Sequence, residues 1–197
     1  DTYGSRSLPV GGVAVAMATD QVIAKAKAIA AHQLEASEDD IQLVSGELSV
    51  RGTPSKAMPS QATAFEAFTA HILPAGTAPN LQATVTYDPP NFVFPFGTHV
   101  AVVEADEDTG EVELRDYVAV DDCGPQVNPM IVEGQLHGGI VQGVAQALWE
   151  GAEYDSEGTL RNPTLIDYCI PSAAEVPSFR LDHTVTPSPT NLLGVKG

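Results

Sequence analysis

A strand, a polar turn and a glycine-rich helix are predicted to follow one another in residues 118–149, VAVDDCGPQVNPMIVEGQLHGGIVQGVAQALW. Asn128 is a favoured N-cap residue and Pro129 suits the first helical turn, so the helix is expected to begin here. Its apolar residues recur at spacings of three and four and form one continuous stripe. They are Val132, Leu136, Ile140, Val141, Val144 and Leu148. This strand-loop-helix unit is the feature around which the rest of the fold must be arranged.

Four glycines interrupt the same helix in two pairs, each pair four residues apart. They are Gly134 with Gly138 and Gly139 with Gly143. A glycine inside a helix costs about 1 kcal/mol relative to alanine, so four of them indicate a reason for close approach. The pattern leaves two readings open, helix packing alone or contact with a ligand.

Composition excludes several classes of protein. The chain has 197 residues, 43% of them hydrophobic, which is typical of a globular protein with a real core. The net charge of -17 argues against nucleic acid and anionic membranes as partners. No apolar run of the length of a membrane span and no secretion signal is evident, and two cysteines are too few for a disulfide framework. We therefore expect a cytoplasmic protein without a membrane span.

The first part of the chain predicts a loop, two helices and a hairpin. Residues 1–9 are expected to be a loop, followed by an alanine-rich helix over 11–35. Two alternating arms, Ile41–Val44 and Glu47–Val50, surround Ser45-Gly46 and predict a hairpin. A short helix is expected over 63–71. The Gly/Pro-rich connector 74–79 predicts a boundary between an N-terminal region, 1–78, and a C-terminal region, 79–197.

The second part has strand periodicity. Residues 81–87 alternate, and the arms 99–105 and 112–120 flank a turn at 106–110. A further hairpin is expected over 151–160 and a strand over 179–186. The fold class predicted is α+β with α/β layers, in which mixed sheets with hairpins pack on the alanine-rich and glycine-rich helices.

Residue types alone support only weak chemical hypotheses. Asp121 and Asp122 at a strand end are most often solvated turn residues. Glu133 and His137 lie one helical turn apart, so a metal-dependent hydrolase that uses these four residues is a remote alternative. Cys123 and Cys169 have no evident base partner, and Ser5 lacks the surrounding motif of a hydrolase nucleophile.

Several motifs in one order resemble a known family. They are TYGSRS near the start, THVAVVEADEDTGEVELRDYVAVDD, DDCGPQVNPMIVEGQLHGGIVQGVAQAL and TPSPTNLLGVKG. Together they resemble the molybdopterin-binding large subunits of the xanthine dehydrogenase and aldehyde oxidase family, and most of all the carbon monoxide dehydrogenase-like group. The resemblance implies a C-terminal fragment of a molybdenum hydroxylase, an oxidoreductase in which molybdenum is held by molybdopterin cytosine dinucleotide.

The same resemblance implies ten cofactor-binding residues. A pterin dinucleotide presents a pyrophosphate and many ring donors and acceptors, which hydroxyls, amide side chains and backbone amides can meet. Asp122 and Cys123 match the nucleotide side and Gln135 the metal-pterin end. Lys196 and Gly197 open the family's GVKGxGE motif. The remaining candidates belong to the first loop: Thr2, Tyr3, Ser5, Arg6 and Ser7.

The family's catalytic Glu would follow three residues after Gly197, and the family's other glycine-rich loops have no match in the sequence. We therefore expect the isolated chain to be inactive, with no catalytic residue and no protein metal ligand of its own. The implied partners are the remainder of the large subunit, an iron-sulfur small subunit and an FAD-binding medium subunit. Exposed apolar surface also predicts self-association into a homo-oligomer. The alternative is a stand-alone, non-catalytic scaffold protein with the same fold.

Overall fold

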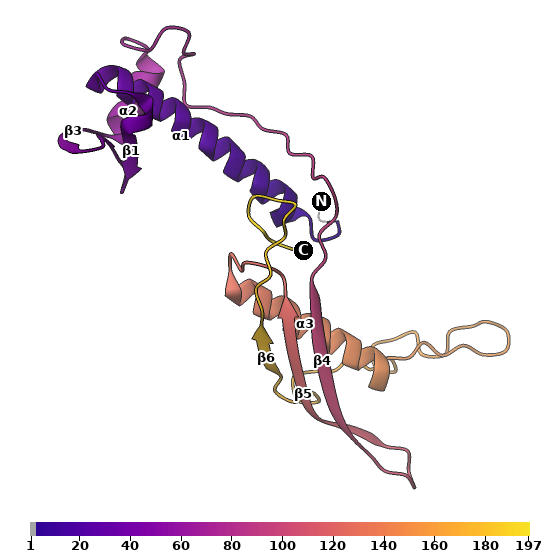
Figure 1. Ribbon diagram of the computed structural model, residues 1–197. Coiled ribbons are helices and arrows are strands. Elements are labelled where there is room, and N and C mark those ends of the chain that lie inside the picture. The colour runs from indigo at the N-terminus through magenta and orange to yellow at the C-terminus, as the bar shows by residue number, and fades with distance from the viewer. Residues whose placement is uncertain (1–2) are drawn as a thin grey trace. The chain divides into compact units, whose positions relative to one another are not determined.

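The computed structural model describes residues 3–197. The chain divides into two compact units, Asp1–Pro90 and Asn91–Gly197 (Figure 1). Helices and two three-stranded sheets confirm the α+β class. Residues 70–95 contain no helix or strand, and the boundary expected at 78/79 falls within them. The alternation of residues 81–87 indicated a strand, and this indication is wrong, because the structure has no strand over these residues.

The long helix of the first unit is α1, Val13–Leu34, in agreement with the alanine-rich pattern. A π-helical turn, η1 (Ser7–Gly12), leads into it. The expected loop is therefore wrong from Ser7 onward. Val10 donates its amide to the Arg6 carbonyl at 3.0 Å, and Pro9 is tolerated because a first helical turn needs few amide donors.

An antiparallel sheet of order β1-β2-β3 packs beside α1. Strands β1 (Ile41–Val44) and β2 (Glu47–Val50) have the predicted bounds. Ser45 and Gly46 both adopt positive φ, 50° and 81°, as a two-residue hairpin with the twist of its strands requires. Strand β3 (Thr53–Pro59) was not predicted, because a proline stands at its second position and another at its end.

The core of this unit joins the end of α1 to the sheet. It consists of Ala30, Ala31, Ile41, Leu48 and Met58. A 3-10 turn, η2 (Glu38–Asp40), connects α1 to β1. Helix α2 (Ser60–Thr69) packs on α1 and begins three residues before the predicted start.

The segment Ser7–Leu34 has the length and mean hydropathy, 1.3, to cross a membrane. This is a criterion of length and composition, which core helices of globular proteins also meet. Asp20, Lys25 and Lys27 lie in the middle of the helix, where charges are costly in a bilayer. The absence of a membrane span remains a prediction.

The second unit contains the expected mixed sheet, of order β4-β5-β6. Strands β4 (Phe96–Ala105) and β5 (Val112–Asp122) are antiparallel, with an irregularity at Val102/Val103. Strand β6 (Arg180–His183) pairs with β5 in parallel and is shorter than predicted. The hairpin expected over 151–160 is reduced to a single bridge between Tyr154 and Leu160. The Asp155 side chain accepts the Glu157 and Thr159 amides in the turn between them.

Helix α3 (Pro129–Leu148) begins as predicted, and the Asn128 side chain accepts a hydrogen bond from the Ile131 amide. Its stripe faces the fold at Ile140, which is buried. The close approach expected at the glycines is not made by any described residue. A Cβ atom built on any of the four would meet nothing within 4 Å, so the helix is open along both pairs of glycines.

Candidate functional site

A buried ion pair lies at the carboxyl end of β5. Asp122 has 0% exposure, and its Oδ1 is 2.9 Å from the Lys196 ammonium, whose side chain is 8% exposed. The same Oδ1 accepts the Gly124 amide at 2.9 Å, and Oδ2 accepts the Thr184 hydroxyl at 2.9 Å. Both carboxylate oxygens therefore have partners within the chain.

These contacts keep Asp122 charged. Burial by itself raises the pKa of this carboxyl. The hydrogen bonds from Lys196, from the Gly124 amide and from Thr186 outweigh burial, and they hold the pKa well below its usual range. Asp122 is therefore an anion at every pH at which the protein would normally work.

The segment around Lys196 packs closely on the turn that follows β5. The Lys196 amide donates to the Cys123 carbonyl at 2.8 Å, and Val195 is buried. Gly124 has φ +71°, and a Cβ there would lie 2.4 Å from the Gly194 carbonyl oxygen. Glycine is required at this position for both its conformation and its size. Burial is the main reason that the pKa of the Cys123 thiol is raised, which argues against a reactive thiolate.

Residues 187–196 form a compact loop that presents Lys196. The Ser188 amide donates to Gly194 at 2.8 Å, and Asn191 Nδ2 donates to the Val195 carbonyl at 2.9 Å. Asn191 Oδ1 is buried and lacks a hydrogen-bond partner among the described residues. A buried acceptor of this kind fits a donor that lies outside the described chain.

Strand β4 supports the same turn from its other side. His99 Nε2 lies 3.0 Å from Asp121 Oδ2, and its Nδ1 lies 3.0 Å from the Tyr117 hydroxyl. A Cβ on Gly97 would lie 2.2 Å from Asp121 Oδ1. Asp121 is therefore held by β4, while its neighbour Asp122 is held by the C-terminal segment.

Gln135 is the exposed polar candidate on α3. Its side-chain amide makes no hydrogen bond within residues 3–197, and the neighbouring Gly134 and Gly138 leave main chain uncovered. An amide supplies both donors and an acceptor, which suits a heterocycle with ring N–H and C=O groups.

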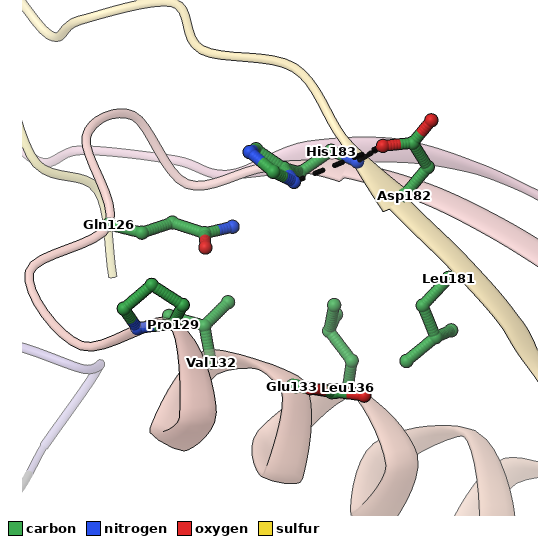
Figure 2. A pocket seen from close by; sticks show the side chains of 8 residues that line it. All are labelled: Gln126, Pro129, Val132, Glu133, Leu136, Leu181, Asp182 and His183. Carbon is green, nitrogen blue, oxygen red and sulfur yellow. Dashed lines mark hydrogen bonds and ion pairs between the residues drawn. The ribbon is translucent and has the colours of Figure 1, made fainter.

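A shallow pocket of about 250 Å³ separates α3 from β6 (Figure 2). Val132, Glu133 and Leu136 line it from α3, whereas Leu181 and His183 line it from β6. This volume is below the roughly 300–1,000 Å³ of typical small-molecule sites, and apolar side chains make up much of the lining. The pocket gives no reason to assign a ligand.

The candidates of the first loop lie in the other unit. Gly4 and Ser5 have φ of 56° and 53°, and Arg6 Nε donates to the Tyr3 carbonyl at 3.1 Å. The guanidinium also stacks 5.0 Å above the Tyr3 ring. Ser7 opens η1. Thr2 lies outside the described residues. The loop therefore exposes a hydroxyl and a positive charge beside an N-terminal helical turn, which suits an anion.

A protein-bound metal finds no support among residues 3–197, because no group of three or more His, Cys, Asp or Glu side chains there has the arrangement to hold one. Asp121 and Asp122 are engaged by His99 and Lys196. His137 Nδ1 is 2.9 Å from the Glu133 backbone carbonyl, within one helical turn. The geometry does not support the hydrolase alternative.

Comparison with known proteins identifies the family of this chain. Residues 1–177 match the family model described as molybdopterin cofactor-binding domain. The chain belongs to this family. Along its whole length it is also 47% identical to the carbon monoxide dehydrogenase large chain of Hydrogenophaga pseudoflava and 38% identical to the nicotine 6-hydroxylase large subunit of Paenarthrobacter nicotinovorans. It spans 24% of the length of each of these relatives.

Solved structures agree with this assignment. A reconstituted CO dehydrogenase from Oligotropha carboxidovorans superposes with a TM-score of 0.92 at 40% identity, and quinoline 2-oxidoreductase from Pseudomonas putida 86 with 0.90 at 42%. Each comparison covers 100% of this chain, and 24% and 25% of the solved chain. The predicted resemblance to the carbon monoxide dehydrogenase-like large subunits is confirmed.

Within the second unit, the structure brings Asp122, Cys123 and Lys196 together, with Gly197 next along the chain. Gln135 is separate from this contact, on the open face of α3. Sequence reasoning missed His99 and Thr184, which anchor the two aspartates. The alternation in β4 was the available signal for His99, since it placed Gly97 and His99 on one face. Nothing local marked Thr184.

Proposed function

We propose that this chain is part of the large subunit of a molybdenum hydroxylase and helps to bind its pterin cofactor. The observation that carries the proposal is identity of 47% along the whole chain to a carbon monoxide dehydrogenase large chain. The alternative, a scaffold protein without chemistry, has no observation in its favour. Because the chain spans about a quarter of its relatives, the proposed activity belongs to the whole subunit and not to these residues alone.

The residues fit a molybdopterin dinucleotide. Ser5, Ser7, Tyr3 and Arg6 would meet its phosphates, and the Gln135 amide would meet the pterin. Support comes from the tight Gly4-Ser5 turn, in which both residues have positive φ, and from the uncovered backbone beside Gln135. Cys123 and Gly197 would contribute main-chain groups, and Asp122 and Lys196 lie beside them. Thr2 completes the set by resemblance.

When bound, this cofactor supplies the molybdenum at which substrate is oxidised. We propose the cytosine dinucleotide form, because the motifs most resemble the bacterial carbon monoxide dehydrogenase-like group. An iron-sulfur subunit and an FAD-binding subunit would accept the electrons, and a cytoplasmic location suits such an assembly. The names of two relatives support a multi-subunit enzyme, since they are a large subunit and a subunit of a dehydrogenase complex.

The test is the cofactor content of the full-length subunit purified with its accompanying subunits. We expect about one molybdenum per large subunit and one equivalent of CMP released by acid hydrolysis. Arg6→Ala should lower both, whereas Arg51→Ala, another exposed arginine of the same unit, should not. GMP or no nucleotide in place of CMP would refute the cytosine form. Absence of molybdenum and pterin together would refute the function.

A further inference from the structure

We propose that Asp122 and Lys196 are positioning residues, which form an internal clamp and do not bind the cofactor through their charges. The clamp fixes the direction of the chain where it passes Lys196 and Gly197. Its role in an enzyme rests on the proposed function above, but its existence is a property of this unit alone. Both side chains would then have a role other than the direct cofactor contact that the family resemblance implies.

The carboxylate of Asp122 is fully engaged within the chain. Oδ1 accepts from Lys196 and from the Gly124 amide, and Oδ2 accepts from Thr184. With 0% exposure, Asp122 presents no surface to a ligand. A buried anion beside an anionic cofactor would also repel it, unless its charge is neutralised by a cation. Lys196 supplies that cation.

The Lys196 ammonium interacts with groups of this chain on two sides. It lies 2.9 Å from Asp122 and 4.4 Å above the centre of the Phe96 ring, so a carboxylate and an aromatic face both stabilise its charge. Because the Lys196 side chain is only 8% exposed, its ammonium would have to move outward, away from Asp122, to bind a phosphate directly. That movement would strand a carboxylate without its counter-ion in the interior, which is strongly unfavourable.

Lys196 is attached at two points, which makes the pair a clamp and not only a bridge. Its side chain reaches Asp122, while its main-chain amide donates to the carbonyl of Cys123, the next residue. Two contacts to neighbouring residues fix both the position and the direction of the backbone at Lys196. The close fit of Gly124 against Gly194 adds a third contact just before it. The path of the chain at Lys196 is therefore fixed relative to the end of β5.

The test compares Asp122→Asn, Lys196→Met and the double variant in the full-length subunit. A phosphate ligand and a clamp predict opposite patterns. If Lys196 bound a cofactor phosphate, Lys196→Met would lower cofactor content, and Asp122→Asn would maintain or raise it, since a repelling charge is removed. If the two form a clamp, both single variants should lower cofactor content alike, and the double variant should lose no more than the worse single variant. Lys56→Met, at an exposed lysine, is the control and should change nothing.

A second measurement uses the full-length subunit and does not depend on the cofactor. The alkylation rate of Cys123, read at its own peptide by mass spectrometry, reports whether the segment around Lys196 is seated. We expect Asp122→Asn and Lys196→Met each to raise this rate about tenfold or more, which corresponds to 1.4 kcal/mol of easier opening. Unchanged rates in both variants would overturn the clamp, as would opposite effects on cofactor content. A wild-type enzyme without pterin would refute the proposed function and leave the clamp to be judged by the thiol rates.

Discussion

Replacing Gly124 by alanine provides a severe test of the packing described at the end of β5. Gly124 and Gly110 both have positive φ, +71° and +76°, so an alanine at either position costs about 1–2 kcal/mol in backbone strain. Only Gly124 is crowded. A Cβ there would lie 2.4 Å from the Gly194 carbonyl, whereas a Cβ at Gly110 would meet nothing within 4 Å. The difference between the two variants isolates the steric contact from the strain.

The size of the destabilisation by Gly124→Ala can be estimated from the contacts that the segment around Gly194 would lose. To admit the methyl group, the segment around Gly194 has to leave the turn, which breaks the hydrogen bond from Lys196 to Cys123, about 1 kcal/mol. It also uncovers part of Val195, whose full burial is worth about 1.5–3 kcal/mol. We therefore expect Gly124→Ala to destabilise the protein by about 2–4 kcal/mol more than Gly110→Ala. At about 2–4 °C per kcal/mol, the unfolding midpoint should fall about 5–15 °C further.

The assay is thermal unfolding of both variants, followed by circular dichroism, together with the alkylation rate of Cys123 in a Cys169→Ser background. If the segment opens locally without global unfolding, the thiol rate rises in Gly124→Ala while the midpoint changes less. Equal midpoints and equal thiol rates in the two variants would refute the close fit of Gly124 against Gly194.

Three further outcomes are expected. Gln135→Ala should lower the pterin content of the full-length subunit, whereas Gln146→Ala, an exposed glutamine on the same helix, should not; equal content in both would remove Gln135 from the site. The pKa of Asp122 is depressed in the folded state, so its contribution to stability is complete above the unfolded pKa of about 3.9 and is lost as pH falls below that value. Acid unfolding curves of Asp122→Asn should therefore be flatter below about pH 4 than those of the wild type, and parallel curves would contradict this. The isolated chain should self-associate, since Phe94, Met130 and Ile166 are more than 70% exposed, and a monomer at high concentration in light scattering would argue against it.

The sequence predicted those elements correctly that a short local motif specifies by itself. Ser45-Gly46 specified a hairpin, and Asn128-Pro129 specified a helix start, because both depend on residues a few positions apart. Alternation over residues 81–87 misled, since a strand also needs a partner. The pattern describes one chain segment and contains no information about what lies beside it.

For the candidate site, the sequence likewise predicted which residues belong together but not what each of them does. Motifs identified Asp122, Cys123 and Lys196 as a related set, and the structure brings these three together across 74 positions of sequence. Their roles were not predictable, because a sequence does not show whether a lysine side chain contacts a phosphate or a buried carboxylate. Thr184 donates its hydroxyl to Asp122, but nothing in the sequence distinguishes it from the other threonines. Only the parallel pairing of β6 with β5 brings it to this position.

Strand β4 has a practical consequence for anyone who works with this unit by itself. It is ten residues long, exposed throughout, and only one of its two edges is paired within residues 3–197. Val100, Val102 and Val103 stand along a row of open amides and carbonyls, which is a template for intermolecular cross-strand addition and fibrillar aggregation. The irregularity at Val102/Val103 is the only interruption of that template. The substitution Val102→Lys would place a charge on this edge and is the simplest change to keep the unit in solution.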